Sequence, residues 1–183
     1  MTLSDCCTVE GAAKAPAVMA CPVSGTRSKR VESLTVRSLV RHLPLGMPPT
    51  EYYFCDSADC DVIYFPSNPA APLFRRADLM VRVGIKEAED PIPVCYCFGF
   101  TRQDIWDEIR QKGKSTIAEQ IKLEVKAGNC ACEVKNPSGR CCLGDIVRIV
   151  QEGARAPVSD PGDGGPSEAR ANRHGNTSGF SSQ

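Results

Sequence analysis

The chain has 183 residues, and its 22 basic and 22 acidic residues give a formal net charge of zero. No basic block is long enough to indicate a nucleic-acid-binding surface, and no apolar stretch approaches the length of a membrane span. We therefore expect neither nucleic-acid binding nor membrane insertion. The N-terminus shows no charged segment followed by an apolar one, so the sequence predicts no signal peptide and a cytoplasmic location.

Eleven cysteines are present, an odd number, and most of them stand in close pairs. Disulfides are rare in reducing compartments, where clustered cysteines more often bind metal or take part in catalysis. Because the sequence shows no export signal, this pattern favours metal ligation over a disulfide framework.

Composition divides the chain into four segments. Residues 1–20 have no convincing hydrophobic period and are predicted to form a flexible arm. From Gly153 onward the chain is rich in Gly, Ser, Pro and Asp and almost lacks large apolar residues, so we expect a disordered tail over 153–183. Between these ends the sequence predicts a β-rich subdomain over 21–90 and a helical subdomain over 91–152.

The β-rich segment contains several predicted elements. Glu51–Cys55 and Asp61–Phe65 are rich in aromatic and β-branched residues, which predicts two strands around a tight turn. Leu79–Ile85 is a further short strand candidate, and Ser38–Leu43 has weak helical character.

The helical segment carries clear start and stop signals. Thr101 followed by Asp104 resembles a capping box, and Gly113 is expected to end the first helix. Thr116 repeats the start signal, and Gly128 is a good C-terminal cap for the second helix. Apolar residues between positions 143 and 150 predict one last short helix.

Six cysteines bracket the predicted helix pair. They form an opening C-Y-C pair, Cys95 and Cys97, and a closing group, Cys130, Cys132, Cys141 and Cys142. Two helices that run out and back return the second group to the first, so four thiolates can converge as a [2Fe–2S] cluster requires. A C-x-C pair is too tight for both sulfurs to bind one small tetrahedral metal, and it fits better across two irons. Zinc is the rival interpretation, because spacing does not identify the metal.

A turn is predicted between Cys132 and Cys141. The sequence N-P-S-G-R, with Pro137, Ser138 and Gly139 at its centre, is expected to bring Cys141 and Cys142 back to the first pair. Amides of this turn could donate hydrogen bonds to cluster sulfur and tune the reduction potential.

A second candidate metal site lies in the β-rich segment. Cys55 and Cys60 stand at the two ends of a knuckle between predicted strands, as in zinc ribbons, and Cys21 supplies a third thiolate. Structural zinc takes four ligands. A C-P-x-C motif would supply the fourth, but this chain has Ser24 at that place, a poor zinc ligand. The candidates for the fourth position are Cys6, Cys7, Asp56 and water.

These motifs resemble a known family. V-C-Y-C-F-G-F-T, the two predicted helices and A-G-N-C-A-C-E-V-K-N-P-S-G-R-C-C-L-G-D are similar to the N-terminal domain of CopZ-type copper chaperones over residues 21–150. The cluster region is also distantly similar to bacterioferritin-associated ferredoxin. The resemblance implies a mononuclear zinc in the first half and a [2Fe–2S] cluster held by one C-x-C pair and two later cysteines. We favour Cys95, Cys97, Cys132 and Cys142 for the cluster, with Cys130 and Cys141 as alternates, and Cys21, Cys55 and Cys60 for zinc.

The sequence therefore predicts an α+β protein in which a zinc-knuckle β subdomain precedes a helix-turn-helix [2Fe–2S] subdomain, with disordered termini. We expect a one-electron carrier in metal homeostasis, and the resemblance points to copper. The M-x-C-x-x-C loop of the family's copper domain does not occur in this sequence. The implied partners are a copper chaperone or a copper-transporting ATPase and an electron donor.

No nucleophile–base pair or paired catalytic carboxylates can be assembled from the sequence, so we expect no catalytic residues. Copper(II) reduction would then be an electron-transfer activity. Two alternatives stay open: an all-zinc interaction module, and a protein that sequesters or transfers soft ions such as copper(I), with Cys6 and Cys7 as its thiols.

Overall fold

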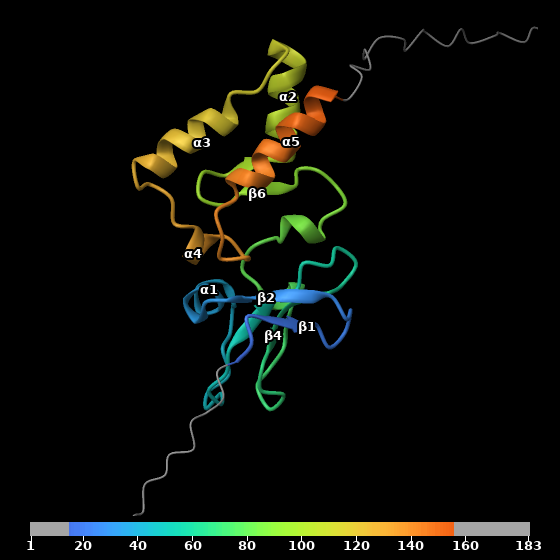
Figure 1. Ribbon diagram of the computed structural model, residues 1–183, viewed down its shortest axis with the longest axis vertical. Helices are drawn as coiled ribbons and strands as arrows, with labels where there is room; N and C mark the ends of the chain where they lie inside the picture. Colours follow the sequence, from blue (N-terminus) through green and yellow to red (C-terminus); the bar gives the residue numbers. More distant parts are fainter. Residues whose placement is uncertain (1–14, 156–183) are drawn as a thin grey trace, which may run out of the picture.

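The computed structural model describes residues 15–155. Within them an antiparallel sheet occupies the first part of the chain and helices the second, which confirms the predicted α+β fold (Figure 1). Residues 1–14 and 156–183, which include most of the predicted arm and tail, lie outside the described residues. No helix between residues 15 and 155 is long and apolar enough to cross a membrane.

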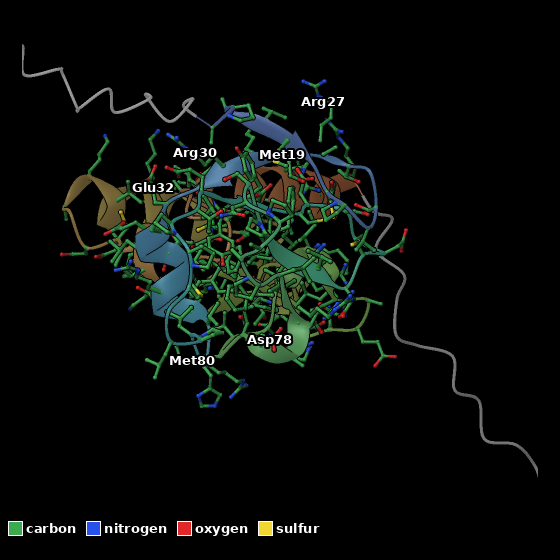
Figure 2. All side chains as sticks on the ribbon, turned by 90° about the horizontal axis from the view of Figure 1, so that it is seen from below. Met19, Arg27, Arg30, Glu32, Asp78 and Met80 are labelled. Atoms are coloured by element: carbon green, nitrogen blue, oxygen red, sulfur yellow. The ribbon has the colours of Figure 1, made fainter. Side chains whose placement is uncertain are left out.

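Five short strands form one antiparallel sheet in which each strand pairs with its neighbour in the chain. They are β1 (Val18–Ala20), β2 (Arg27–Val31), β3 (Tyr52–Phe54), β4 (Val62–Pro66) and β5 (Phe74–Arg75). β3 and β4 confirm the two strands predicted between residues 51 and 65, and Tyr53 lies opposite Phe65 in their register. Arg27 and Arg30 of β2 are exposed to solvent at the surface of this sheet (Figure 2).

A hydrophobic core lies on each face of the sheet. Successive side chains of a strand point to opposite faces, so one strand contributes to both cores. Tyr52 and Phe54 of β3 pack in one core together with residues of β2 and of helix α1 (Ser33–Leu39). Tyr53 of the same strand packs in a second core, which also contains the cysteines of the β-rich segment. β4 contributes to both cores, and its first four residues are all buried.

Three details of this half differ from the sequence prediction. The segment Leu79–Ile85 is not a strand: Leu79 makes one isolated bridge to Val40, and the chain then forms the 3-10 turn η2 (Gly84–Lys86). An earlier 3-10 turn, η1 (Arg76–Asp78), follows β5. Helix α1 begins earlier than the predicted helical segment 38–43. β1 falls within residues 1–20, for which the sequence predicts no regular structure; it forms by pairing with β2.

The helical half begins with a two-stranded hairpin and continues through four helices. These elements are β6 (Pro93–Cys95), β7 (Phe100–Thr101), α2 (Arg102–Lys112), α3 (Ile117–Lys126), α4 (Cys132–Lys135) and α5 (Leu143–Arg155). α5 packs against both α2 and α3 (Figure 1). The side chains of Ile105, Ile121 and Ile146 fill this contact.

The predicted helix signals are largely confirmed. The Thr101 amide donates to Asp104 Oδ2 at 2.7 Å and the Asp104 amide donates to Thr101 Oγ1 at 3.2 Å, which is the predicted capping box. α2 ends at Gly113, which adopts φ 74° in the left-handed region that favours glycine. α3 follows Thr116 as predicted, although the Thr116 hydroxyl donates to Glu108 rather than capping the helix.

Glu108 joins α2 to the start of α3 and is therefore more than a surface carboxylate. It accepts hydrogen bonds from Ser115 Oγ at 2.8 Å and from the Thr116 amide at 3.0 Å. Burial opposes ionisation of Glu108, but these hydrogen bonds, together with Lys112, outweigh it and lower its pKa to about 2. The turn between the two helices is thus fixed by an ionised carboxylate.

Helix α5 continues to Arg155, past Gly153, where the sequence predicts the tail to begin. A Cβ atom at position 153 would lie 2.8 Å from both Ile109 Cδ1 and Trp106 Cδ1. Gly153 therefore allows α5 to cross α2 closely, and the helix gains packing that composition alone does not reveal.

Two hydrogen bonds join the segment between Cys132 and Cys142 to the first half of the chain. The Tyr64 hydroxyl of β4 donates to the Pro137 carbonyl at 2.8 Å, and the Thr35 hydroxyl of α1 donates to the Glu133 carbonyl at 2.6 Å. α1 packs against α4 at the same place. Gly139 also lies against α1, because a Cβ there would come within 2.9 Å of Thr35 Oγ1. The segment between Cys132 and Cys142 is therefore held by the sheet half.

We expect Tyr64→Phe to lower the free energy of unfolding by about 1–3 kcal/mol, because the buried Pro137 carbonyl loses its donor. Tyr52→Phe is the matched control: its hydroxyl donates to the Pro72 carbonyl at 3.1 Å, within the sheet half and partly exposed. Its loss should cost less, about 0.5–1.5 kcal/mol. Urea unfolding of both variants measures the difference, and equal losses would show that the Tyr64 contact is not special.

Candidate metal centres

Three cysteines of the β-rich half converge as the sequence predicts. Cys21 follows β1, Cys55 follows β3 and Cys60 precedes β4, and all three side chains are buried. Their sulfur atoms lie within 4.8 Å of one another. Zinc–sulfur bonds of about 2.3 Å place the ligand atoms of a tetrahedral site about 3.8 Å apart. The three thiols therefore fit a single zinc ion.

Backbone hydrogen bonds of two turns hold these sulfurs in place. Between β1 and β2 the Cys21 amide donates to the Thr26 carbonyl and the Gly25 amide donates to the Cys21 carbonyl, each at 2.9 Å. Between β3 and β4 the Cys55 amide donates to the Ile63 carbonyl at 2.9 Å. The sheet register therefore presents one sulfur from the first turn and two from the second.

The fourth position of this site has a candidate in Ser24. Its Oγ lies 3.5 Å from Cys55 Sγ. Burial opposes ionisation of Cys21, but the amide and the hydroxyl of Ser24 outweigh it and lower the pKa of the Cys21 thiol. Asp56, a predicted alternative, is exposed and is not part of the compact group. Cys6 and Cys7 lie outside the described residues.

A buried lysine stands beside the three thiols. The Lys86 side chain is 4 % exposed, and its ammonium donates to the Ser57 carbonyl in the turn between Cys55 and Cys60. Burial raises the pKa of the Cys55 thiol, while the charge of Lys86 opposes that rise. Sequence reasoning did not find Lys86, because a single lysine in a charged segment carries no signal of burial.

The second group of cysteines forms two sulfur pairs. Cys97 Sγ lies 3.6 Å from Cys132 Sγ, and Cys142 hydrogen-bonds to Cys95. Cys95 ends β6, Cys132 begins α4 and Cys142 directly precedes α5. The structure thus brings together the four cysteines favoured from the sequence, one sulfur of the C-Y-C pair in each couple.

The four sulfurs are not arranged as a single-metal site. Among residues 15–155, only Cys21, Cys55 and Cys60 bring three such ligand atoms within 4.8 Å of one another. One zinc ion needs four ligand atoms about 3.8 Å apart. Two separate pairs instead match a [2Fe–2S] cluster, in which each iron takes two of the four thiolates.

The alternates Cys130 and Cys141 occupy less favourable positions. Cys130 is partly buried and Cys141 is exposed, whereas Cys132 and Cys142 are buried. Cys141 interacts electrostatically with both Cys132 and Cys142, so it lies near the group without belonging to either sulfur pair.

Hydrogen bonds and burial set unequal pKa values among these thiols. The hydrogen bond from Cys142 outweighs burial and lowers the pKa of Cys95 to about 6. Burial, followed by the contact with Cys97, raises the pKa of Cys132 to about 12. The contact with Cys95, followed by burial, also raises the pKa of Cys142. The pKa values of these thiols are therefore unequal, and Cys95 is the most readily ionised of the three.

The N-P-S-G-R segment is a tight turn, as predicted, but its amides serve the turn itself. The Ser138 amide donates to Asn136 Oδ1 at 3.0 Å and the Gly139 amide donates to the Asn136 carbonyl at 2.7 Å. The amide that approaches Cys97 Sγ, at 3.3 Å, belongs to Ala131. The amides of Cys97 and Phe98 also donate to Cys95, and the Cys142 amide donates to Cys132. The hydrogen bonds to the cluster cysteines therefore come from backbone next to the cysteines themselves rather than from the turn.

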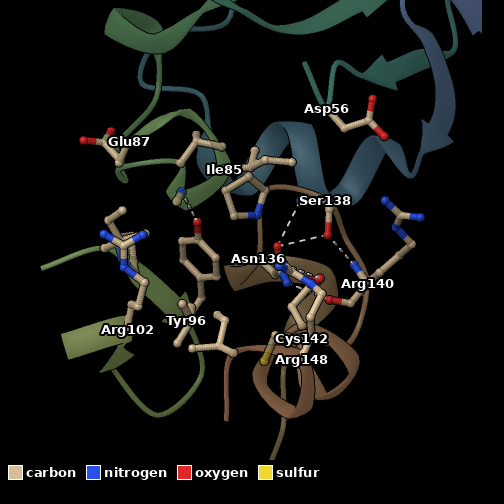
Figure 3. Close-up of a pocket in the computed structure, with 18 of the residues that line it drawn as sticks. Asp56, Ile85, Glu87, Tyr96, Arg102, Asn136, Ser138, Arg140, Cys142 and Arg148 are labelled. Atoms are coloured by element: carbon tan, nitrogen blue, oxygen red, sulfur yellow. Dashed lines mark hydrogen bonds and ion pairs between the residues drawn. The ribbon is translucent and has the colours of Figure 1, made fainter. Parts of the chain in front are cut away.

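A cavity of about 390 Å³ lies between the two halves and reaches Cys142 (Figure 3). Arg140 and Arg148 of the helical half line it, as do Asp56 and Glu87 of the β-rich half. Tyr96 also lines the cavity, and its hydroxyl accepts a hydrogen bond from the Gly84 amide at 2.8 Å. A residue of the second sulfur group is thus accessible from an opening with charged walls.

Comparison with known proteins agrees with this geometry. Residues 18–80 match a family described as a zinc binding domain, and residues 93–152 match a family described as a BFD-like [2Fe–2S] binding domain. A protein of Archaeoglobus fulgidus named copper chaperone CopZ is 34% identical over 132 residues. That alignment covers 72% of this chain and 62% of the length of the Archaeoglobus protein.

The X-ray structure of the N-terminal domain of Archaeoglobus fulgidus CopZ is also similar. Its TM-score to this structure is 0.56 at 34% sequence identity, and the match covers 72% of this chain and 97% of that domain. The zinc and [2Fe–2S] cofactors expected from the sequence are thereby supported in two separate segments. The chain belongs to the family of CopZ N-terminal domains, which joins a zinc-binding domain to a BFD-like [2Fe–2S]-binding domain.

Proposed function

We propose that this protein carries single electrons in copper homeostasis, with a [2Fe–2S] cluster as the redox centre and zinc in the sheet half. The observation that carries the proposal is the two sulfur couples, three of whose four cysteines are buried, beside a cavity that reaches Cys142. Iron–sulfur clusters exchange one electron at a time. The link to copper rests on the similarity to the Archaeoglobus copper chaperone.

The geometry supports a specific set of cluster ligands. Cys95 and Cys142 would bind one iron, and Cys97 and Cys132 would bind the other. This division agrees with the expectation that the two sulfurs of a C-x-C pair ligate different irons. The Ala131 amide, 3.3 Å from Cys97 Sγ, would remain as a hydrogen-bond donor to the sulfur of that residue and would favour the reduced state.

We expect single alanine substitutions of these four ligands to abolish the cluster. Cys130→Ala and Cys141→Ala are the matched controls, because they remove neighbouring thiols that belong to neither sulfur pair. Iron content and the visible spectrum of each anaerobically purified variant measure the effect. A variant at one of the four positions that keeps its iron and spectrum, while Cys130→Ala or Cys141→Ala loses them, would overturn this assignment.

The cavity offers a route for electrons between the cluster and a partner or substrate. Cys142 is 4 % exposed but lines the cavity, so a redox partner seated there would come close to the cluster without exposing it to bulk water. Charged residues of both signs line the cavity, among them Arg140, Arg148 and Asp56, and they favour a polar partner. We propose that an electron donor, and a copper chaperone or copper-transporting ATPase, are the partners.

The copper substrate gives a direct test of electron transfer. One electron leaves the cluster and reduces one copper(II) ion to copper(I), with no proton or further reductant needed. We expect the reduced holoprotein to form about one copper(I) per cluster, since a [2Fe–2S] centre delivers one electron. A copper(I)-specific chromophoric chelator measures the yield, and Cys95→Ala, which lacks the cluster, is the control. Equal copper(I) formation by both proteins would contradict the proposal.

Cluster assembly should depend on pH in a defined direction. At pH 7 the Cys95 thiol, with its pKa lowered to about 6, is largely ionised, while Cys132, with its pKa raised to about 12, is protonated. Metal binding requires thiolates and must therefore expel protons. We expect the yield of cluster on anaerobic reconstitution of the apoprotein to rise between pH 6.5 and about 9. A yield that falls or stays constant over this range would contradict the thiol arrangement.

The cysteines Cys21, Cys55 and Cys60 are proposed to hold zinc in a structural role. Their sulfurs form part of the core on one face of the sheet, and few other apolar side chains support that core. Zinc that joins the β1–β2 turn to the β3–β4 knuckle would therefore stabilise a subdomain with limited apolar burial. The proposed cytoplasmic location follows from the reducing conditions that free thiols require.

A further inference from the structure

We infer that Ser24 occupies the fourth corner of the zinc site, so that the ion is held by three thiolates and one exchangeable oxygen ligand. This inference rests on the proposed zinc site and goes beyond it, because it assigns an exchangeable ligand to the fourth position, which the three cysteines leave undetermined. The consequence is a zinc ion that passes to a competing ligand faster than a four-thiolate site allows.

The Ser24 hydroxyl is positioned beside the sulfurs of the zinc site. Ser24 lies in the turn that presents Cys21, three residues further along the chain, and its Oγ is 3.5 Å from Cys55 Sγ. The Thr26 amide donates to Ser24 Oγ at 3.3 Å, which orients the hydroxyl within the turn. Since the same hydroxyl also hydrogen-bonds to Cys21, it reaches two of the three sulfurs. No carboxylate or imidazole joins this compact group within residues 15–155.

The net charge of the zinc site favours three thiolates over four. Three thiolates and one Zn²⁺ carry a net charge of −1, whereas four thiolates carry −2. Lys86 is 4 % exposed and places one positive charge next to Cys55. In the part of the chain that the structure describes, no carboxylate oxygen lies within 4.0 Å of its ammonium. Buried charges are normally paired, and a three-thiolate zinc site is the partner that neutralises this lysine.

The proposed zinc ligands differ in their exposure to solvent. Cys21, Cys55 and Cys60 are buried, whereas Ser24 is exposed to solvent. A closed structural site surrounds zinc with strong ligands, while an open site keeps one position for water or an incoming ligand. A hydroxyl is a weaker ligand for zinc than a thiolate. The fourth corner is thus both the weakest bond and the side that an acceptor can approach.

The test uses the full-length holoprotein and X-ray absorption at the zinc edge, which does not detect the iron of the cluster. For the wild type we expect three sulfur neighbours at about 2.3 Å and one oxygen at about 2.0–2.2 Å. Ser24→Cys should convert this sphere to four sulfurs. Four sulfur neighbours in the wild type would overturn the inference, as would loss of a neighbour in the double variant Cys6→Ser, Cys7→Ser.

Zinc release to an excess of a chromophoric chelator gives the second measurement. We expect Ser24→Cys to release zinc at least about tenfold more slowly than the wild type, because the open corner is closed by a thiolate. Ser24→Ala, in which only water can fill the corner, should release it faster. Equal release by all three proteins would overturn the inference.

The cluster spectrum separates this inference from the proposed function. All Ser24 variants should keep the iron content and visible spectrum of the wild type, because Ser24 belongs to neither sulfur pair of the helical half. A wild type without iron but with the zinc sphere described here would contradict the redox function and leave the Ser24 assignment intact.

Discussion

The buried hydrogen bond from the Tyr64 hydroxyl to the Pro137 carbonyl joins the sheet to the turn that lies between Cys132 and Cys142. On one side of this bond, Tyr64 belongs to β4, the strand that follows the Cys55–Cys60 knuckle. On the other side, Pro137 belongs to the turn between Cys132 and Cys142. A side chain that is itself fully buried thus fixes the backbone that carries half of the proposed cluster ligands.

This arrangement makes the zinc knuckle more than a local support. The β3–β4 register sets the position of Tyr64, and the knuckle closes the end of that hairpin. The contact of Thr35 with Glu133 and the close approach of Gly139 to α1 extend the same interface. Zinc in the sheet half would therefore stabilise the geometry of the redox site without touching it.

The two candidate metal centres also differ in the charged residues that surround them. Lys86 is buried against the knuckle and compensates thiolates there, whereas the charged residues near Cys142 line a cavity that opens to solvent. A fixed internal cation suits a site whose charge does not change. A cavity with both signs of charge beside Cys142 suits the electron transfer that we propose for the helical half.

Much of this structure follows from sequence patterns that act over short distances. The aromatic and β-branched residues of β3 and β4, the Thr101–Asp104 capping box and Gly113 each determine local geometry, and each is confirmed. Two helices joined by a short turn return to their starting point, so the convergence of Cys132 and Cys142 on the C-Y-C pair is predictable from connectivity.

The remaining features depend on contacts between distant segments. Leu79–Ile85 has the composition of a strand, but Gly84 lies so close to the Pro93 carbonyl that the chain turns there instead. In the sequence, Gly153 suggests the start of an unstructured tail. In the structure, Gly153 lies within α5, and Trp106 and Ile109 of α2 pack against it. The burial of Lys86 and the hydroxyl contact of Tyr64 likewise have no local signal, because their partners lie elsewhere in the chain.

The zinc-binding and [2Fe–2S]-binding segments predict two different metal centres in one chain. The content of iron, acid-labile sulfide and zinc in anaerobically purified full-length protein, together with the paramagnetic resonance spectrum after reduction, tests this prediction. We expect about two irons, two sulfides and one zinc per chain, with the signal of a reduced [2Fe–2S] centre. About two zinc ions per chain, with neither iron nor a signal, would contradict it.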